Sequence, residues 1–148
     1  MRKCLSLLFL FLISNVFSQE NEYFIDANFD VNNRLVEIYQ TIDFTNTTSN
    51  SLNYIILNDW AHSYSNPKTP LGKRLSEDFT LNFQRSTKNQ RGFTNIIHIK
   101  SDSIILEHTR LKVNIDLVKV KLSNALKPNQ KITINIKYKI KIPISDFT

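Results

Sequence analysis

The stretch ITINIKYKIKI, residues 132–142, decides the fold, because apolar and polar side chains alternate along it. Such alternation places an apolar row on one face of a β-strand and a polar row on the other. A strand of this kind is stable only when its apolar face packs against another layer of structure. The rest of the chain is therefore expected to supply further strands.

Three earlier segments carry related patterns. Residues 23–31 alternate with period two, and Asn32-Asn33 then gives a turn signal. Residues 34–46 follow as a second strand, in which Gln40 interrupts the apolar face and needs a hydrogen-bond partner if it is buried. These two runs predict a hairpin. Residues 52–57 alternate less, which predicts a third strand that is buried on both faces.

The middle of the chain breaks this rhythm. Thr69 and Pro70 have the form of a helix start, with Thr69 as the N-cap and Pro70 at the first helical position. Gly72 lowers the helix propensity slightly. An apolar residue then recurs every four positions, which predicts a helix of about three to four turns with one apolar stripe. The stripe consists of Leu71, Leu75, Phe79 and Phe83.

Strands are predicted again after this helix. Residues 95–100 and 103–108 are short, β-branched runs joined by a polar turn. In residues 111–122 the apolar positions shift from odd to even, which indicates a β-bulge or a bend between sheets. Residues 126–130 turn before the last strand. The chain is thus predicted to be mainly β, with antiparallel sheets in a sandwich or saddle-like arrangement and one helical insertion.

Residues 1–18 have the layout of a secretory signal peptide. A short basic start precedes a mostly apolar run, residues 5–16, that is short for a bilayer span, although an uncleaved anchor is the alternative. Cleavage after Ser18 leaves one domain, residues 19–148, in the periplasm or outside the cell, with no stable membrane insertion. Asn46-Thr47-Thr48 is formally a glycosylation acceptor, which matters only on a eukaryotic secretory route.

Composition narrows the chemistry of that domain. Its one cysteine, Cys4, leaves with the signal peptide, so neither a disulfide nor a thiolate metal ligand is expected. Loss of Arg2 and Lys3 lowers by two the formal net charge of +6. The remaining lysines, such as Lys137 and Lys139, alternate with apolar residues as on a solvated sheet face. No nucleic-acid partner is expected, because Tyr138 is the only aromatic residue interleaved with these lysines and no row of rings for base stacking results.

Residues with catalytic or metal-binding chemistry are few. The three histidines, His62, His98 and His108, form no H-E-x-x-H zinc motif, and no G-x-S-x-G nucleophile turn occurs. The sequence therefore predicts no catalytic, cofactor-binding or metal-binding residue in this chain. Trp60, His62 and Tyr64 follow the third strand closely. They are interpreted as a small core cluster, with a ligand-stacking platform as the alternative.

Two stretches around the predicted helix carry a family resemblance. Residues 57–66 read LNDWAHSYSN, residues 69–75 read TPLGKRL, and Arg91-Gly92-Phe93 comes after the helix. Together they resemble the N-terminal domain of exported bacterial zinc metallopeptidases of the aminopeptidase N type, which are gluzincins. The order of the surrounding strands also fits, so that the resemblance covers essentially the whole domain. Its most specific part is the segment 60–75.

The resemblance implies a role as well as a fold. In that family a saddle-shaped β-domain precedes a thermolysin-like catalytic domain, which carries the zinc motif and a Gly-x-Met-Glu-Asn substrate loop. Neither motif occurs in this sequence, which stops at Asp146-Phe147-Thr148, and a truncated or split gene product is therefore expected. Such a fragment has no peptidase activity by itself. Its partner is the catalytic domain of the same or a split polypeptide, which alone would bind zinc and the peptide substrate.

Two other interpretations stay open. The first is a free-standing extracytoplasmic β-sandwich that binds a glycan or acts as an adhesin, with Trp60 and Tyr64 as stacking residues. The second is a decayed gene product without a selected function. The docking role makes a physical prediction, because a face that packs on a catalytic domain would be left as an exposed apolar patch in the isolated chain.

Overall fold

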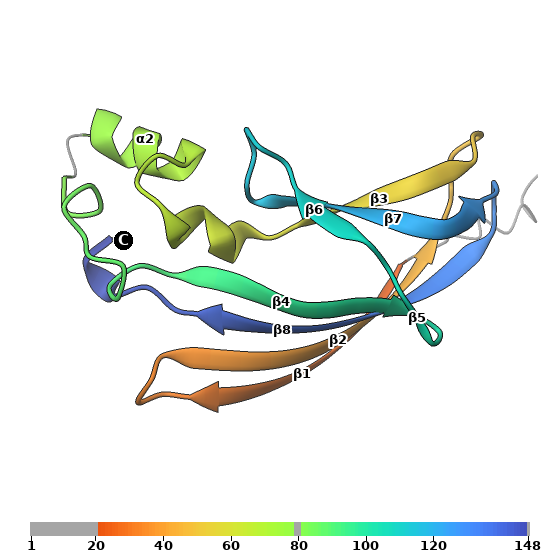
Figure 1. Ribbon diagram of the computed structural model, residues 1–148, viewed down its shortest axis with the longest axis horizontal. Helices are drawn as coiled ribbons and strands as arrows, with labels where there is room; N and C mark the ends of the chain where they lie inside the picture. The colour runs from red at the N-terminus through yellow and green to blue at the C-terminus, as the bar shows by residue number, and fades with distance from the viewer. Residues whose placement is uncertain (1–20, 79–80, 148) are drawn as a thin grey trace, which may run out of the picture.

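The computed structural model describes residues 21–78 and 81–147 and is built mainly from antiparallel strands in two layers (Figure 1). One layer is a five-stranded sheet in the order β1-β2-β8-β4-β5, and the other is a three-stranded sheet in the order β3-β7-β6. The predicted fold class, a mainly β sandwich of antiparallel sheets with little helix, is therefore confirmed.

The elements follow one another in a simple order along the chain. They are β1 (Glu22–Asp30), β2 (Leu35–Thr45), β3 (Leu52–Asn58), the 3-10 helix η2 (Trp60–Ser65), the α-helix α2 (Pro70–Glu77), β4 (Phe93–Ser101), β5 (Ile104–Ile105), β6 (His108–Arg110), β7 (Leu117–Leu126), β8 (Lys131–Lys141) and the 3-10 turn η3 (Ser145–Phe147). Both η2 and α2 lie at one end of the sandwich, and the turns β2–β3 and β7–β8 lie at the other (Figure 1).

Strand β8 is the centre of the larger sheet. It pairs with β2 over eleven residues on one side and with β4 on the other. Its alternation explains this place, since Ile134 and Ile136 are buried against the second sheet while the lysines of the other row stay at the outer face. Lys137 lies over the ring of Tyr39, with its Nζ 4.5 Å from the ring centre.

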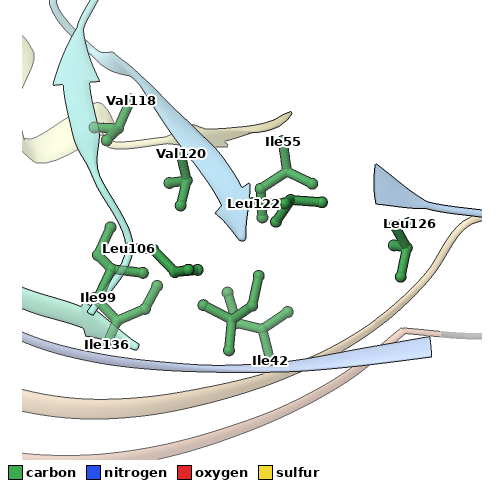
Figure 2. Close-up of a cluster of buried hydrophobic side chains, with 10 residues drawn as sticks. Ile42, Ile55, Ile99, Leu106, Val118, Val120, Leu122, Leu126 and Ile136 are labelled. Atoms are coloured by element: carbon green, nitrogen blue, oxygen red, sulfur yellow. The ribbon is translucent and has the colours of Figure 1, made fainter. Parts of the chain in front are cut away.

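The core fills the space between the two sheets (Figure 2). Ile99, Val120 and Ile134 have no exposed surface at all. Side chains from both layers point toward one another, as Figure 2 shows. This buried cluster consists of Ile42, Ile55, Ile99, Leu106, Val118, Val120, Leu122, Leu126, Ile134 and Ile136.

Asn46 ties together the two turns at one end of the sandwich. Its side chain is fully buried, and its Nδ2 donates to the carbonyl oxygens of Asn50 at 2.8 Å and Leu126 at 2.9 Å. Its Oδ1 accepts from the backbone N–H of Thr48 at 3.0 Å. Because both amide hydrogens are used inside the fold, the formal glycosylation acceptor is not accessible in the folded domain.

The prediction of burial on both faces is wrong for β3. Only Ile55 is buried in this strand, whereas Tyr54 and Ile56 are exposed. The reason is that the outer face of the smaller sheet has no layer of the described residues over it, since the central strand β7 also alternates between buried and exposed residues. Lys119 of β7 lies across the exposed ring of Tyr54, with its Nζ 4.0 Å from the ring centre.

The start of the predicted helix is confirmed, but its length is wrong. Thr69 caps α2 by accepting from the backbone N–H of Gly72 at 3.0 Å. The helix ends at Glu77, and Phe83 is fully buried in a turn beyond it. Phe79 lies outside the described residues. A Cβ at Gly72 would lie 2.2 Å from the carbonyl oxygen of Pro67, so glycine is needed for this close approach.

Two predicted strands also have different limits. Residues 111–116 form turns and bends, and β7 begins only at Leu117. The shift of the apolar positions therefore marks a loop and not a β-bulge. The predicted strand 103–108 is divided, because β5 pairs with β4 in the larger sheet and β6 pairs with β7 in the smaller one. Leu106 lies between them and is buried in the core.

Candidate docking groove

A groove of about 450 Å³ opens between the two sheets, on the side where β1 and β3 are edge strands. Its walls come from both layers, with β1, β2, β4 and β8 on one side and β3 with the start of η2 on the other. The lining is mostly apolar and includes Tyr23, Ile42, Leu57, Ile96 and Ile136. A groove of this size and composition suits a hydrophobic partner better than a charged one.

Strand β1 extends the larger sheet beyond the cover of the smaller one. All nine of its residues are exposed, in contrast to every other long strand of the sandwich. Tyr23 pairs in register with Ile42, and Phe29 pairs with Val36, so these rings lie on the same face as the core. They are 57% and 65% exposed. The apolar inner face therefore continues past the groove onto an uncovered strand.

A polar cluster closes one end of the groove. Asp59, which follows β3, accepts a hydrogen bond from the Thr94 hydroxyl on β4 at 2.5 Å. Its other carboxylate oxygen pairs with Arg110 of β6 at 2.6 Å. Arg110 also donates to the carbonyl oxygen of Ile115 at 3.0 Å. Because β4 belongs to one sheet and β6 to the other, this network fixes the spacing of the two layers at the groove.

His62 of η2 completes this cluster. Its Nδ1 lies 3.2 Å from both the backbone nitrogen and the backbone oxygen of Thr94. Burial lowers the pKa of His62 below its ordinary value, and the neighbouring Arg110 charge lowers this pKa further. The neutral ring accepts the Thr94 N–H, so that His62 acts as a structural link between η2 and β4.

Gln40 has the partner that its position in the apolar row requires. The hydroxyl of Tyr138 donates to its Oε1 at 2.8 Å, and both side chains line the groove. Burial and the nearby Asp59 carboxylate raise the pKa of Tyr138. The pair places one neutral hydrogen-bonding group in the wall of a mostly apolar groove.

The aromatic residues of η2 take different places. Tyr64 packs edge-on against the buried Phe83, with ring centres 6.1 Å apart, and Phe83 packs against Phe147 at 5.0 Å. The predicted core cluster is thus correct for Tyr64 and for the half-buried His62. It is wrong for Trp60, which is 57% exposed at the rim of the groove. The stacking platform that would use Trp60 and Tyr64 together is not formed.

The histidines are not brought together. His62 belongs to η2, His98 to β4 in the larger sheet and His108 to β6 in the smaller sheet. In the described part of the chain, no three His, Cys, Asp or Glu side chains gather as ligands for a metal ion. Within residues 21–78 and 81–147, no helix has the length and apolar character needed to cross a bilayer.

No family model and no curated protein matches this chain. The groove itself was missed by the sequence reasoning, although two signals for it exist. Tyr23, Ile25 and Phe29 show the apolar row of β1 but not that this row is uncovered. Asp59 lies inside the stretch that carries the family resemblance, and its partner Arg110 is remote in sequence and visible only in the fold.

Proposed function

We propose that this chain is the non-catalytic N-terminal β-domain of an exported zinc metallopeptidase of the aminopeptidase N type. In this role it packs on the catalytic domain and helps to shape the substrate cleft. It has no peptidase activity by itself, and zinc and peptide bind in the catalytic domain. The observation that carries the proposal is the exposed apolar strand β1 beside the open groove.

The energetic argument rests on the uncovered side chains of β1. Tyr23, Ile25 and Phe29 share the inner face, and each is more than half exposed. Full burial of a large apolar side chain contributes roughly 1.5–3 kcal/mol, and the exposed part of each of these side chains can contribute up to about half of that before the cost of association. Scattered apolar residues are ordinary on a protein surface, but a contiguous apolar row beside a groove is typical of an interaction site. The docking role therefore explains why the apolar row of β1 is exposed, since this row would stay in contact with water in a domain without a partner.

The segment with the most specific family resemblance also has a defined structural role. It forms η2 and α2, which follow Asp59 directly. Asp59 and His62 connect this segment to both sheets at the end of the groove. Residues that carry the family resemblance thus help to form the wall of the docking groove. This supports the proposal better than a resemblance confined to a peripheral loop would.

The first test is to sequence the DNA that follows the Thr148 codon. The proposal expects a frame that encodes H-E-x-x-H with a further Glu downstream, in or out of register with this chain. Export has its own test, because secretion from the native host should yield a mature protein that begins at Gln19. Without any such frame, and with an isolated chain that is soluble and binds no hydrophobic dye, the proposal would be abandoned.

A second candidate function is favoured by one observation, the exposure of Trp60 at the groove rim. A free-standing sandwich could stack a sugar ring on this indole. In that case a glycan-array signal should disappear in Trp60→Ala and persist in Tyr54→Ala, which removes an exposed aromatic ring on β3 outside η2. Equal signals from both variants would remove this candidate.

A further inference from the structure

The free edge of β1 has only one of the usual protections of an edge strand, its acidic side chains. Exposed edges in soluble proteins are normally blunted by charged side chains, above all lysine, by proline, by a β-bulge or by very short strands. Strand β1 has nine residues, contains neither lysine nor proline, and pairs with β2 in unbroken register. Its other side carries no strand in the described chain. Its backbone can therefore pair with an additional strand.

The inner face of β1 defines one row of that strand. Tyr23, Ile25 and Phe29 face the same way as the buried row of β2. A strand added beside them would point every second side chain to this same side, and its end beside Tyr23 would lie at the mouth of the groove. These side chains must be apolar, because the groove wall that they would meet is mostly apolar.

The outer face of β1 defines the other row by its charge. It carries Glu22, Asp26 and Asp30 at every fourth position. The Asp30 carboxylate already accepts from the side-chain amide of Asn33 at 2.7 Å. Glu22 and Asp26 form no ion pair with any side chain of the described residues. The outer row of β1 is therefore acidic and only partly compensated.

The neighbouring pair of strands shows how this fold neutralises such a row. On the outer face, β2 carries Glu37 and Asp43. Strand β8 places Lys139 opposite Glu37, and it places Lys137 and Lys131 diagonally beside Glu37 and Asp43. Lys131 pairs with Asp43 at 3.0 Å, and Lys137 pairs with Glu37 at 3.4 Å. Opposite charges across a strand pair stabilise it by about 0.2–1 kcal/mol. A strand beside β1 would gain in the same way if its outer row were basic.

We infer that β1 binds one extended segment of a protein partner, in which basic residues alternate with apolar residues. The segment adds a sixth strand to the larger sheet. It places its apolar row on the side of the groove and its basic row beside Glu22 and Asp26. This inference deepens the proposed docking role and rests on it only in the assumption that β1 meets a protein partner.

A second copy of the chain is a poorer occupant. When two β1 strands pair antiparallel over all nine residues, Asp26 faces Asp26 and Glu22 faces Asp30 of the other copy. Like charges directly opposite one another destabilise a strand pair. The acidic row therefore selects against self-association and selects for a basic partner.

The test uses a fluorescein-labelled peptide with the sequence of residues 131–141, which has the required alternation. Binding to the full chain is followed by fluorescence anisotropy. Amide hydrogen exchange of the chain is measured with and without the peptide. Expected results are saturable binding that weakens with salt, and slower exchange within residues 22–30. The double variant Glu22→Lys/Asp26→Lys should bind about tenfold more weakly or worse.

The controls separate this mode of binding from its alternatives. Glu77→Lys makes the charge change of one of these two substitutions at a distant site on α2 and should leave the affinity within about twofold. A peptide with the lysines replaced by glutamate should not bind. Protection of residues 52–58 on β3, equal loss in Glu77→Lys, or protection of β1 by concentration-dependent self-association would each overturn the inference. A downstream catalytic frame combined with no peptide binding would overturn it and leave the proposed function standing.

Discussion

Replacement of Asn46 by alanine tests the link between the turns β2–β3 and β7–β8, which lie at the same end of the sandwich. The change removes the donors to the carbonyl oxygens of Asn50 and Leu126, and the acceptor for the Thr48 N–H. The Thr48 groups are near solvent and can bond to water. The carbonyl of Leu126 cannot, because its hydrogen bond with Asn46 is buried. The domain should therefore lose stability without losing its fold.

The size of the loss follows from the groups left behind. A buried acceptor without a partner costs roughly 1–3 kcal/mol, and each ordinary hydrogen bond that is lost costs about 1 kcal/mol. With two donated bonds removed, the expected loss in the free energy of unfolding is about 3 kcal/mol. For a urea slope of about 2 kcal/mol/M, this lowers the unfolding midpoint by about 1.5 M.

The assay is urea unfolding followed by circular dichroism, with Asn50→Ala as the matched control. That control removes an amide side chain from the same turn, while the backbone carbonyl of residue 50 still accepts from Asn46. Its midpoint should stay close to that of the unchanged protein. If Asn46→Ala shifts the midpoint no more than Asn50→Ala does, the reasoning about the buried carbonyl is refuted.

Three further predictions concern the groove and its supports. Gly72→Ala should destabilise the domain, because the new methyl group would lie 2.2 Å from the carbonyl oxygen of Pro67, which outweighs the gain in helix propensity of about 1 kcal/mol. Arg110→Met should cost about 2 kcal/mol in urea unfolding, since it leaves the largely buried Asp59 carboxylate without its counter-charge. His62→Gln should flatten the loss of stability between pH 7.5 and 5.5. The lowered pKa of His62 means that the unfolded chain binds more protons below pH 6.5, so stability falls as the pH falls.

Each of these predictions has a control. Lys73→Ala lies beside Gly72 on the exposed side of α2 and should leave stability nearly unchanged. Lys121→Met breaks only the exposed ion pair with Glu107. It should lower the free energy of unfolding by less than about 1 kcal/mol, as is usual for exposed ion pairs. For His62→Gln the control is the unchanged protein measured over the same pH range, where the loss of stability should be steeper. A control that equals its partner variant would contradict the corresponding argument.

The sequence predicted best those strands that bury one face and expose the other. Strand β8 was clear because its inner row is buried and its outer row is charged. Strand β3 was misjudged, because a short apolar run is the same whether its sheet is covered on both faces or, as here, has an outer face that exposes Tyr54 and Ile56. The apolar spacing up to Phe83 suggested a longer helix, although that ring reaches the core from a turn.

The candidate site was less predictable because it depends on contacts between remote segments. The Asp59–Arg110 pair joins residues that no local pattern connects. Asn46 matched a modification motif, while in the fold its side chain is a buried hydrogen-bonding hub. The exposure of β1 was also hidden, since its alternation is the same as that of a strand covered by a second sheet. Local periodicity gives the face of a strand and not what lies above it.

The pairing of β2 with β8 has a consequence for how this chain reaches its fold. Strand β2 has its longest pairing with β8, so the larger sheet cannot be completed before residues 131–141 are available. Contacts between such distant segments make folding slow. Until then the β1–β2 hairpin keeps its apolar face in water, where it is open to binding by chaperones and to aggregation.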